Sequence, residues 1–386
     1  MATTAQAIVE LWLSLSPDGH TELALSIPLA KCQALATHPL RWLRFLGCAI
    51  YGQKGHLSTS NAGPPIDDYT ADIMAHPPRL VDVDVMDDRT SDASDLSDGR
   101  ADFRHRVVGR DVTCVRTGEL AEHCDACHII PHSKGDDYIR NALSHRSETD
   151  IVDELDGIDD TRNGLLLWSP LHRPFGAGAL TFLKTPNFYL DVDDIPYNPP
   201  REENQASPAS RLTLHYIVDS GLGRMLPGIV PNNSDLREPE DTSTWPPVII
   251  LNLCYASAAL CAWAPVTFRQ TIRAMVKDTY YDASDDSTAN SQDEPDDTGP
   301  RISKELSLRA QRLERRNERK LQAAHPGEMH LSSAMDGVLA LWMRSKGRGK
   351  QILQTATDFK NARDKVWSWI DSEGIDFNSR ALRESE

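Results

Sequence analysis

The sequence predicts an α+β fold, with short strands and separate helices distributed along a chain of 386 residues. Three observations lead to this prediction. Strand-like runs bounded by turn signals occur near the N-terminus and again in the middle of the chain. A long apolar run follows residue 247, and apolar residues recur at helical spacing near the C-terminus. No internal repeat is visible, and the length allows two or three domains.

Composition places the chain among globular proteins, with 40% hydrophobic and 25% charged residues. The net charge of −16 argues against a chain built wholly to coat a polyanion. It does not exclude an enzyme that acts on nucleic acid, because only the electrostatic field at the active site matters for that activity. The seven cysteines are odd in number and scattered, and the first 19 residues lack the pattern of a secretory signal. These features predict a reducing, intracellular location, with nucleus and cytoplasm both open.

Residues 1–66 are predicted to form a small α+β unit. The runs "IVELWLSLS" and "HTELALSIP" flank an S-P-D-G-H turn, which indicates a β-hairpin. Residues 67–102 are rich in Asp and Ser and poor in large apolar side chains, so they are predicted to be an acidic flexible linker.

Residues 103–200 are predicted to form the central domain, beginning with a β-rich run at 103–118. Residues 201–281 contain a Pro-rich segment and then the apolar run 248–266, predicted to pack on the central domain. That run approaches the length of a membrane span. Its polar residues Asn252 and Ser257 and the absence of basic flanks favour a buried helix instead, so no membrane association is predicted.

Residues 282–300 are predicted to be a second acidic, disordered linker, and residues 301–386 a helical C-terminal region. Its first helix is basic, with eight Lys or Arg against three Glu in 301–320. This helix would either grip a nucleic-acid backbone or lie exposed with internal ion pairs, and both interpretations remain open.

A first interpretation of the central domain is a zinc site. Cys124 and Cys127 have the C-x-x-C spacing of half a tetrahedral zinc site. Cys114 stands alone, since Thr117 occupies the place of its partner, and a complete site would need ligands such as His123. His145 is another candidate. On this interpretation the chain is a structural protein stapled by zinc.

A second interpretation joins "CDACHIIP" to "RNGLLLWSPLHRPFGAG" at 162–178. Asn-Gly is a tight-turn signal, because both residues tolerate positive φ, and "LLLW" is typical of a buried strand. Ser169 is predicted as an N-cap, with Pro170 at the first helical position. The order strand, turn, strand, short helix would bring His128 and His172 to a common cation.

The ordered set "CHIIP … RNGLLL … LHRPFGAG … FLKTPNF" resembles the HNH nuclease domain of the ββα-metal family, in the form found in many fungal proteins. The resemblance covers roughly residues 104–200, with His128, Asn163 and His172 as the three namesake positions. It implies an endonuclease that hydrolyses phosphodiester bonds of nucleic acid, with DNA favoured over RNA. It also implies that His128 is the general base, that Asn163 holds the hairpin and orients His128, and that His172 binds one divalent ion. Mg²⁺ is expected, with Mn²⁺ and Zn²⁺ open.

Two positions depart from the family pattern. Many HNH nucleases carry Asp or His directly before the base, where this chain has Cys127, a soft ligand better suited to zinc than to magnesium. Gly176 stands where some relatives have a further ligand, so a module that binds nucleic acid or a protein partner without cleaving is the alternative.

Three more residues complete the set of candidates. Asp125 is the candidate substitute ligand, because it lies two residues before Cys127 on the predicted strand. His132 and Lys134 are weaker candidates for contacts with substrate phosphate, since Asp136 beside them supplies opposing charge.

Overall fold

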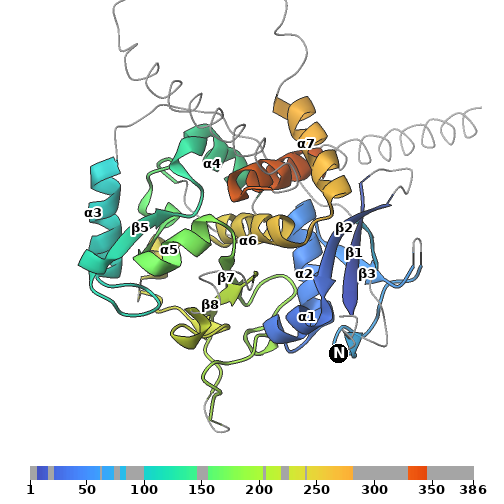
Figure 1. Cartoon of the computed structure of the whole chain (residues 1–386), viewed down its shortest axis with the longest axis horizontal. Coiled ribbons are helices and arrows are strands. Elements are labelled where there is room, and N and C mark those ends of the chain that lie inside the picture. The colour runs from blue at the N-terminus through green and yellow to red at the C-terminus, as the bar shows by residue number, and fades with distance from the viewer. Residues whose placement is uncertain are drawn as a thin grey trace, which may run out of the picture.

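The computed structural model describes residues 7–15, 21–60, 63–73, 79–83, 100–145, 155–202, 206–218, 226–239, 241–280 and 329–345. Helices and small antiparallel sheets alternate along the described chain, in agreement with the predicted α+β class (Figure 1). The predicted acidic linker at 282–300, the basic helix at 301–320 and the residues after 345 lie outside the described residues.

The chain begins with the predicted hairpin. Strands β1 (Ile8–Ser14) and β2 (Thr21–Pro28) pair antiparallel, with an irregularity between Leu11 and Trp12. In β1 the buried residues alternate with exposed or half-exposed ones, which is the pattern of a strand with one face on a core. Two helices follow, α1 (Leu29–Leu35) and α2 (Pro39–Tyr51).

Strand β3 (Gly55–Ser58) pairs antiparallel with β4 (Arg79–Val83). The prediction of a linker over 67–102 is therefore wrong at 79–83. Three of the five residues in "RLVDV" are apolar and two of these are valines, which suit a strand, but the acidic composition around the run masked this signal.

Helix α3 (Arg100–Asp111) corrects a second prediction, because residues 103–118 were expected to be rich in strands. Phe103 and Val107 are buried on one face, while Arg104 and Arg106 are exposed. The apolar residues are four apart, as on one face of a helix, and this period prevails over the β propensity of the Val pair.

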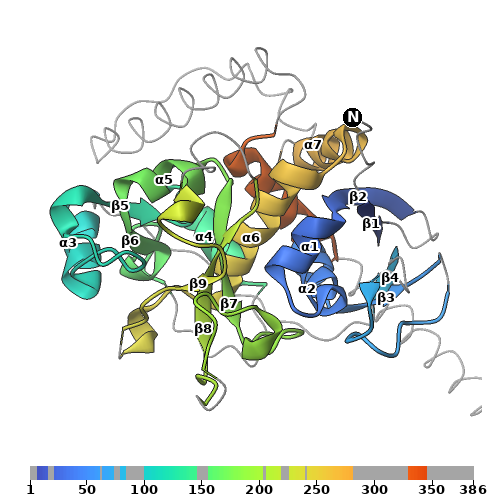
Figure 2. The ribbon, with the colours of Figure 1, turned by 60° about the horizontal axis from the view of Figure 1, so that its bottom comes forward.

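Helix α6 (Val248–Trp263) lies at the centre of the molecule and is the predicted buried helix. It contacts α2 and β2 on one side, and β7 (Leu180–Thr185) and α4 (Asp136–Leu143) on the other (Figure 2). The N-terminal hairpin and the central region thus share one core helix. No helix in the described part of the chain has the length and apolarity needed to cross a membrane. Helix α7 (Val266–Tyr280) follows.

Residues 331–345 form the helix that the apolar spacing from Leu331 to Trp342 predicts. Its Trp342 is 1% exposed and donates a hydrogen bond from Nε1 to the carbonyl oxygen of Ala49, at 3.0 Å. Gly52 ends α2 with φ of 83°, and a Cβ there would lie 2.4 Å from the Trp342 ring. Glycine is therefore required twice over at this position, for its conformation and for space.

A three-stranded sheet, in the order β7-β8-β9, lies against α6. Strand β7 pairs antiparallel with β8 (Arg211–Tyr216), which pairs antiparallel with β9 (Ser234–Asp235). Every residue of β8 is buried, including His215. The Nδ1 atom of His215 lies 2.8 Å from the hydroxyl of Tyr255 on α6, and its Nε2 atom lies 3.3 Å from Thr213 Oγ1.

The buried His215 predicts acid sensitivity. Burial lowers the pKa of His215 from 6.5 to about 3. At a pH between these two values, His215 is protonated in the unfolded chain but neutral in the folded protein. The free energy of unfolding should therefore decrease as the pH is lowered, by about 1.4 kcal/mol per pH unit between pH 6 and 4 through this residue. Chemical denaturation at several pH values should show a shallower fall for His215→Gln and an unchanged fall for the exposed His56→Gln. Equal slopes for wild type and His215→Gln would contradict the prediction.

Candidate functional site

The candidate site is built on a two-stranded hairpin and the helix that follows it. Strand β5 (Cys124–His128) pairs antiparallel with β6 (Gly164–Trp168), so that His128 lies opposite Gly164 at one end of the ladder. Helix α5 (Ser169–Gly176) follows β6 directly and contacts both strands. The predicted order of strand, strand and short helix is present, and helix α3 also contacts both strands.

Helix α5 begins one residue earlier than predicted. Trp168 is the N-cap residue, and Ser169 is the first helical residue, with its hydroxyl donating to the carbonyl oxygen of His123 at 3.1 Å. Pro174 lies inside the helix on its buried side. The helix ends two residues later, and Gly178 follows in a left-handed conformation with φ of 71°.

Gly164 is needed for space and not for an unusual backbone conformation. Its φ is −136°, which is ordinary extended backbone, whereas the Asn-Gly pair predicted a positive φ. A Cβ at Gly164 would lie 2.6 Å from Cζ of Phe103. The glycine therefore lets α3 approach the hairpin closely, and this approach places the Phe103 ring next to His128.

Asn163 is fully buried and holds the two sides of the hairpin together. Its Oδ1 atom accepts a hydrogen bond from the amide of Ile130 at 2.9 Å. Its Nδ2 atom donates to the carbonyl oxygens of Ile130 and Ile158, at 3.0 and 2.8 Å. These contacts support the predicted role in holding the hairpin. They act on the main chain just after His128, so any orienting effect on the ring is carried by the backbone.

The His128 ring lies between an aromatic face and a carboxylate. It is stacked on Phe103, with centroids 3.7 Å apart and planes inclined by 11°. Its Nε2 atom lies 2.9 Å from Oδ1 of Asp159, and both side chains are largely buried. The stack sets the plane of the ring, and the contact with the carboxylate sets its rotation within that plane.

Of the two residues proposed to contact phosphate, His132 lies beside His128 and Lys134 is engaged elsewhere. The Nε2 atom of His132 is 3.4 Å from Oδ2 of Asp159, and its ring meets His128 edge-on with centroids 5.6 Å apart. The ammonium group of Lys134 contacts both carboxylate oxygens of Asp336, at 2.8 and 2.9 Å. Lys134 therefore ties the region after β5 to the C-terminal helix 331–345.

Asp125 and His172 form a second pair. The Nδ1 atom of His172 on α5 lies 3.1 Å from Oδ2 of Asp125 on β5, and both side chains are a little over 40% exposed. A carboxylate oxygen and an imidazole nitrogen thus lie close together at an accessible position. The sequence predicted one cation shared by His128 and His172, but in the structure each imidazole contacts a carboxylate of its own.

Cys127 points into the core. Its side chain belongs to a residue that is 1% exposed, and burial raises the pKa of the thiol. Its sulfur donates to the carbonyl oxygen of Asp125 at 3.4 Å, and the sulfur of Cys124 donates to that of Leu120 at 3.2 Å. A zinc site requires thiolates, whereas both of these sulfurs act as protonated donors.

Metal ligands are correspondingly few. Within the described ranges, no group of three or more His, Cys, Asp or Glu side chains is arranged to hold a metal ion. Gly176, four residues after His172, has no heavy atom within 4 Å of the place where a Cβ would lie, so this position faces open space and offers no ligand.

Sequence reasoning did not identify Asp159 or Phe103. Asp159 lies four residues before Asn163, in the run "DGIDDTRNG", where three aspartates occur within five positions. The spacing to Asn163 was the available signal, but it does not distinguish Asp159 from Asp160. Phe103 was assigned to a strand, which separates it from the hairpin.

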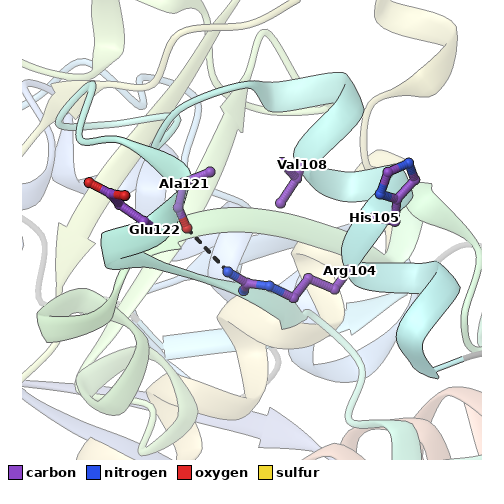
Figure 3. Close-up of a pocket in the computed structure, with 5 residues that line it drawn as sticks. All are labelled: Arg104, His105, Val108, Ala121 and Glu122. Atoms are coloured by element: carbon purple, nitrogen blue, oxygen red, sulfur yellow. Dashed lines mark hydrogen bonds between the residues drawn. The ribbon is translucent and has the colours of Figure 1, made fainter.

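A pocket of about 350 Å³ lies on the α3 side of β5 (Figure 3). Its lining comes from α3 and the turn before β5, through Arg104, His105, Val108, Ala121 and Glu122. The guanidinium of Arg104 donates to the carbonyl oxygens of Ala121 and Cys124, at 3.1 and 2.9 Å. Arg104 therefore braces α3 against the turn and the start of β5, and we assign the pocket no part in the reaction.

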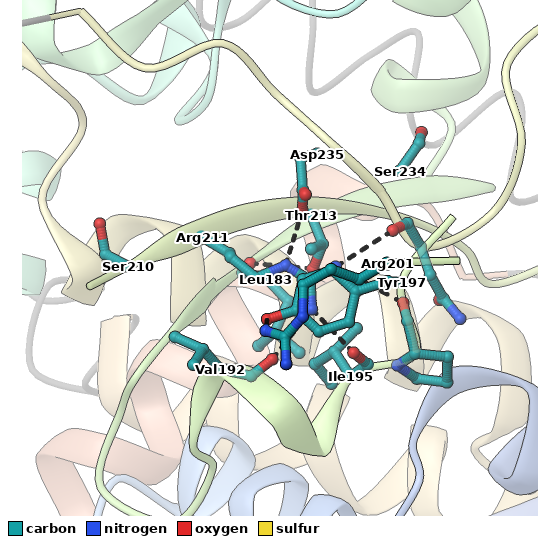
Figure 4. Close-up of polar contacts among 12 residues, drawn as sticks. Leu183, Val192, Ile195, Tyr197, Arg201, Ser210, Arg211, Thr213, Ser234 and Asp235 are labelled. Atoms are coloured by element: carbon teal, nitrogen blue, oxygen red, sulfur yellow. Dashed lines mark hydrogen bonds and ion pairs between the residues drawn. The ribbon is translucent and has the colours of Figure 1, made fainter. Parts of the chain in front are cut away.

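A further polar cluster surrounds Arg211 on β8 (Figure 4). Its side chain is 1% exposed and donates to Asp235 Oδ1 and to the carbonyl oxygens of Val192 and Ile195, at 2.7–2.9 Å. The guanidinium lies 3.8 Å from the centroid of the Tyr197 ring. These contacts tie β8 to β9 and to the loop after β7, which is a structural role.

Comparisons with known proteins agree with the resemblance in the central region. The profile of the HNH endonuclease family matches residues 114–183, a segment that contains β5, β6, α5 and most of β7. No curated protein matches the chain, and no solved structure does. His128, Asn163 and His172 all fall inside the matched segment. Residues 114–183 are therefore an HNH endonuclease domain.

Proposed function

We propose that this domain is a metal-dependent endonuclease that hydrolyses phosphodiester bonds of nucleic acid, with DNA favoured over RNA. An HNH endonuclease domain indicates nuclease activity in general. The observation that carries the proposal is the His128 ring, held by Phe103 and Asp159 at the end of a hairpin inside the matched segment. A general base must be held in a fixed orientation, and these two contacts hold the imidazole of His128.

In the proposed reaction a water oxygen forms a bond to phosphorus, and the bond from phosphorus to the leaving oxygen breaks. His128 takes the proton that the attacking water loses, and the leaving oxygen acquires a proton from solvent. Asn163 keeps the main chain after His128 in place through its hydrogen bonds with Ile130. We propose His132, which shares Asp159 with His128, as a contact to substrate phosphate.

Asp125 and His172 are the proposed metal ligands. In an octahedral shell with bonds of about 2.1 Å, adjacent ligand atoms lie about 3.0 Å apart. The Oδ2 and Nδ1 atoms of this pair are separated by 3.1 Å, so they fit neighbouring positions on one ion. Mg²⁺ is the expected ion, with Mn²⁺ or Zn²⁺ as alternatives, and when bound it would offset negative charge on the phosphate. Cys127 is left out of this set because its thiol is buried. With the ion, β5, β6 and α5 would make the ββα-metal core.

A plasmid-nicking assay tests the proposal. Wild-type protein should convert supercoiled DNA to the open circle with Mg²⁺ or Mn²⁺ and lose this activity in EDTA. His172→Ala should lower the nicking rate by about 10²-fold at a fixed low metal concentration, because one of the two protein ligands is lost. His56→Ala, an exposed histidine outside the matched segment, is the matched control and should cleave normally.

The alternative is a module that binds nucleic acid or a protein partner without cleaving it. Gly176, which offers no third ligand, favours this alternative. Wild-type protein that shifts DNA in a gel but nicks no more in Mg²⁺, Mn²⁺ or Zn²⁺ than in EDTA would establish it and refute the endonuclease. Tightly held zinc in stoichiometric amount, lost on Cys124→Ser, would instead support a zinc-stapled structural protein.

A further inference from the structure

Asp159 supplies a carboxylate that contacts the proposed base, and it is itself largely buried at 7% exposure. Each of its two oxygens contacts an imidazole ring. Oδ1 lies 2.9 Å from Nε2 of His128, and Oδ2 lies 3.4 Å from Nε2 of His132. The shorter contact has hydrogen-bond geometry, whereas the longer one is weaker. His128 is therefore the ring that Asp159 holds most firmly.

The main chain around Asp159 is fixed on both sides. The Ile158 carbonyl oxygen accepts a hydrogen bond from Asn163, and the Asp159 carbonyl oxygen accepts one from Nη2 of Arg106, at 2.8 and 2.9 Å. Because the carbonyl oxygens of Ile158 and Asp159 are both held, the Asp159 side chain has little freedom to leave the His128 ring.

An Asp159 contact of this kind selects one tautomer of His128. An ionised carboxylate only accepts hydrogen bonds, so the Nε2 atom facing it must carry the proton. In a neutral imidazole the lone pair then lies on Nδ1, and Nδ1 becomes the nitrogen that accepts a proton from water. The parallel stack on Phe103 restricts the direction in which Nδ1 points.

We propose that Asp159 is the positioning residue of the nuclease site, which fixes the Nε2-protonated tautomer and the orientation of His128. This inference rests on the proposed function only for its effect on catalysis, since the contact itself is independent of cleavage. Asp159 acts through His128 and touches neither the substrate nor the metal.

The matched pair of variants is Asp159→Asn and Asp160→Asn. The two residues are neighbours in the chain and similarly buried, at 7 and 8% exposure. The Asp160 carboxylate contacts Arg162 and main-chain amides. Both variants remove one buried carboxylate from the same loop and keep its shape, but Asp159→Asn also changes the partner of His128. A purely structural role for Asp159 would make the two variants behave alike.

Two measurements separate these possibilities in full-length protein. In the nicking assay we expect Asp159→Asn to lower kcat by about 10²-fold with KM changed less than threefold, because the base is misoriented while the substrate is still bound. Asp160→Asn should keep kcat within about threefold of wild type. Equal kcat losses for both variants, after correction for the folded fraction, would overturn the proposal.

The second measurement does not require cleavage. In metal-free protein with ¹⁵N-labelled histidine, the ring nitrogens of His128 are assigned by their loss in His128→Ala. Wild type and Asp160→Asn should show protonated Nε2 and unprotonated Nδ1, and Asp159→Asn should lose this preference. A wild-type ring protonated on Nδ1 would overturn the proposal, even if Asp159→Asn failed to fold. If wild type showed the expected tautomer but nicked no DNA, the proposed function would fail and the assignment of Asp159 would stand.

Discussion

His128→Ala is expected to lower the rate of phosphodiester hydrolysis by about 10²- to 10⁴-fold, which is the contribution typical of a positioned general base. Removing the imidazole leaves Asp125 and His172 in place, so the affinity for metal should be unchanged. The reduction should therefore persist at saturating metal. Single-turnover cleavage of a labelled duplex in Mg²⁺ or Mn²⁺ measures this effect on the chemical step.

Three controls distinguish loss of the base from loss of the fold. His56→Ala should cleave like wild type. Removing the largely buried His128 ring takes a partner from the buried Asp159 carboxylate and should lower the unfolding midpoint, so the cleavage rate is corrected for the folded fraction measured by circular dichroism. Added imidazole should partly restore cleavage by His128→Ala, because the small molecule can enter the space beside Phe103 and accept the proton. A His128→Ala protein that cleaves as fast as wild type, with the metal dependence retained, would show that another group is the base.

Asn163→Ala is expected to lower the free energy of unfolding by about 3–5 kcal/mol. The side chain satisfies three main-chain groups, and its loss leaves buried donors and acceptors unpaired at about 1–3 kcal/mol each. Cleavage should fall with it, since the main chain after His128 would be released. Urea denaturation followed by circular dichroism measures the loss of stability.

Asn187→Ala is the matched control for this change. Asn187 also makes three hydrogen bonds with the main chain, to Lys184, Tyr189 and Leu190, but it lies at a half-exposed turn after β7. Water can replace its lost contacts, so we expect a loss of about 1 kcal/mol and normal cleavage. Similar losses for the two variants would mean that burial of Asn163 contributes little.

Strand β6 and the helix that follows it were predictable because their signals are local, although residues 129–163 separate β6 from its partner β5. Asn163 and Gly164 mark a chain reversal, "LLLW" reads as a buried strand, and Pro170 suits the start of a helix. Their order along the chain was enough to place His128 and His172 on neighbouring elements. The reason predicted for Gly164 was nevertheless wrong, because its backbone is extended and its lack of a side chain makes room for Phe103.

Other features depended on packing. Alternation along β5 suggested that Asp125 and Cys127 share a face of the strand. It did not show that the Asp125 side chain is accessible while Cys127 is buried in the core. Composition alone suggested a linker at 79–83, where pairing with β3 makes a strand. In both cases the deciding contacts come from elements outside the local pattern.

By itself the sequence determined the short-range part of this protein: the N-terminal hairpin, the buried helix α6, and the hairpin and helix that carry His128, Asn163 and His172. Tertiary structure decided which carboxylate each histidine meets and which thiols are hidden. It also decided that Trp342 docks on Ala49, 293 positions away. The physical reason is that turn chemistry and periodicity act over a few residues, whereas Asp159, Phe103 and His128 meet only after separate elements have packed into one core.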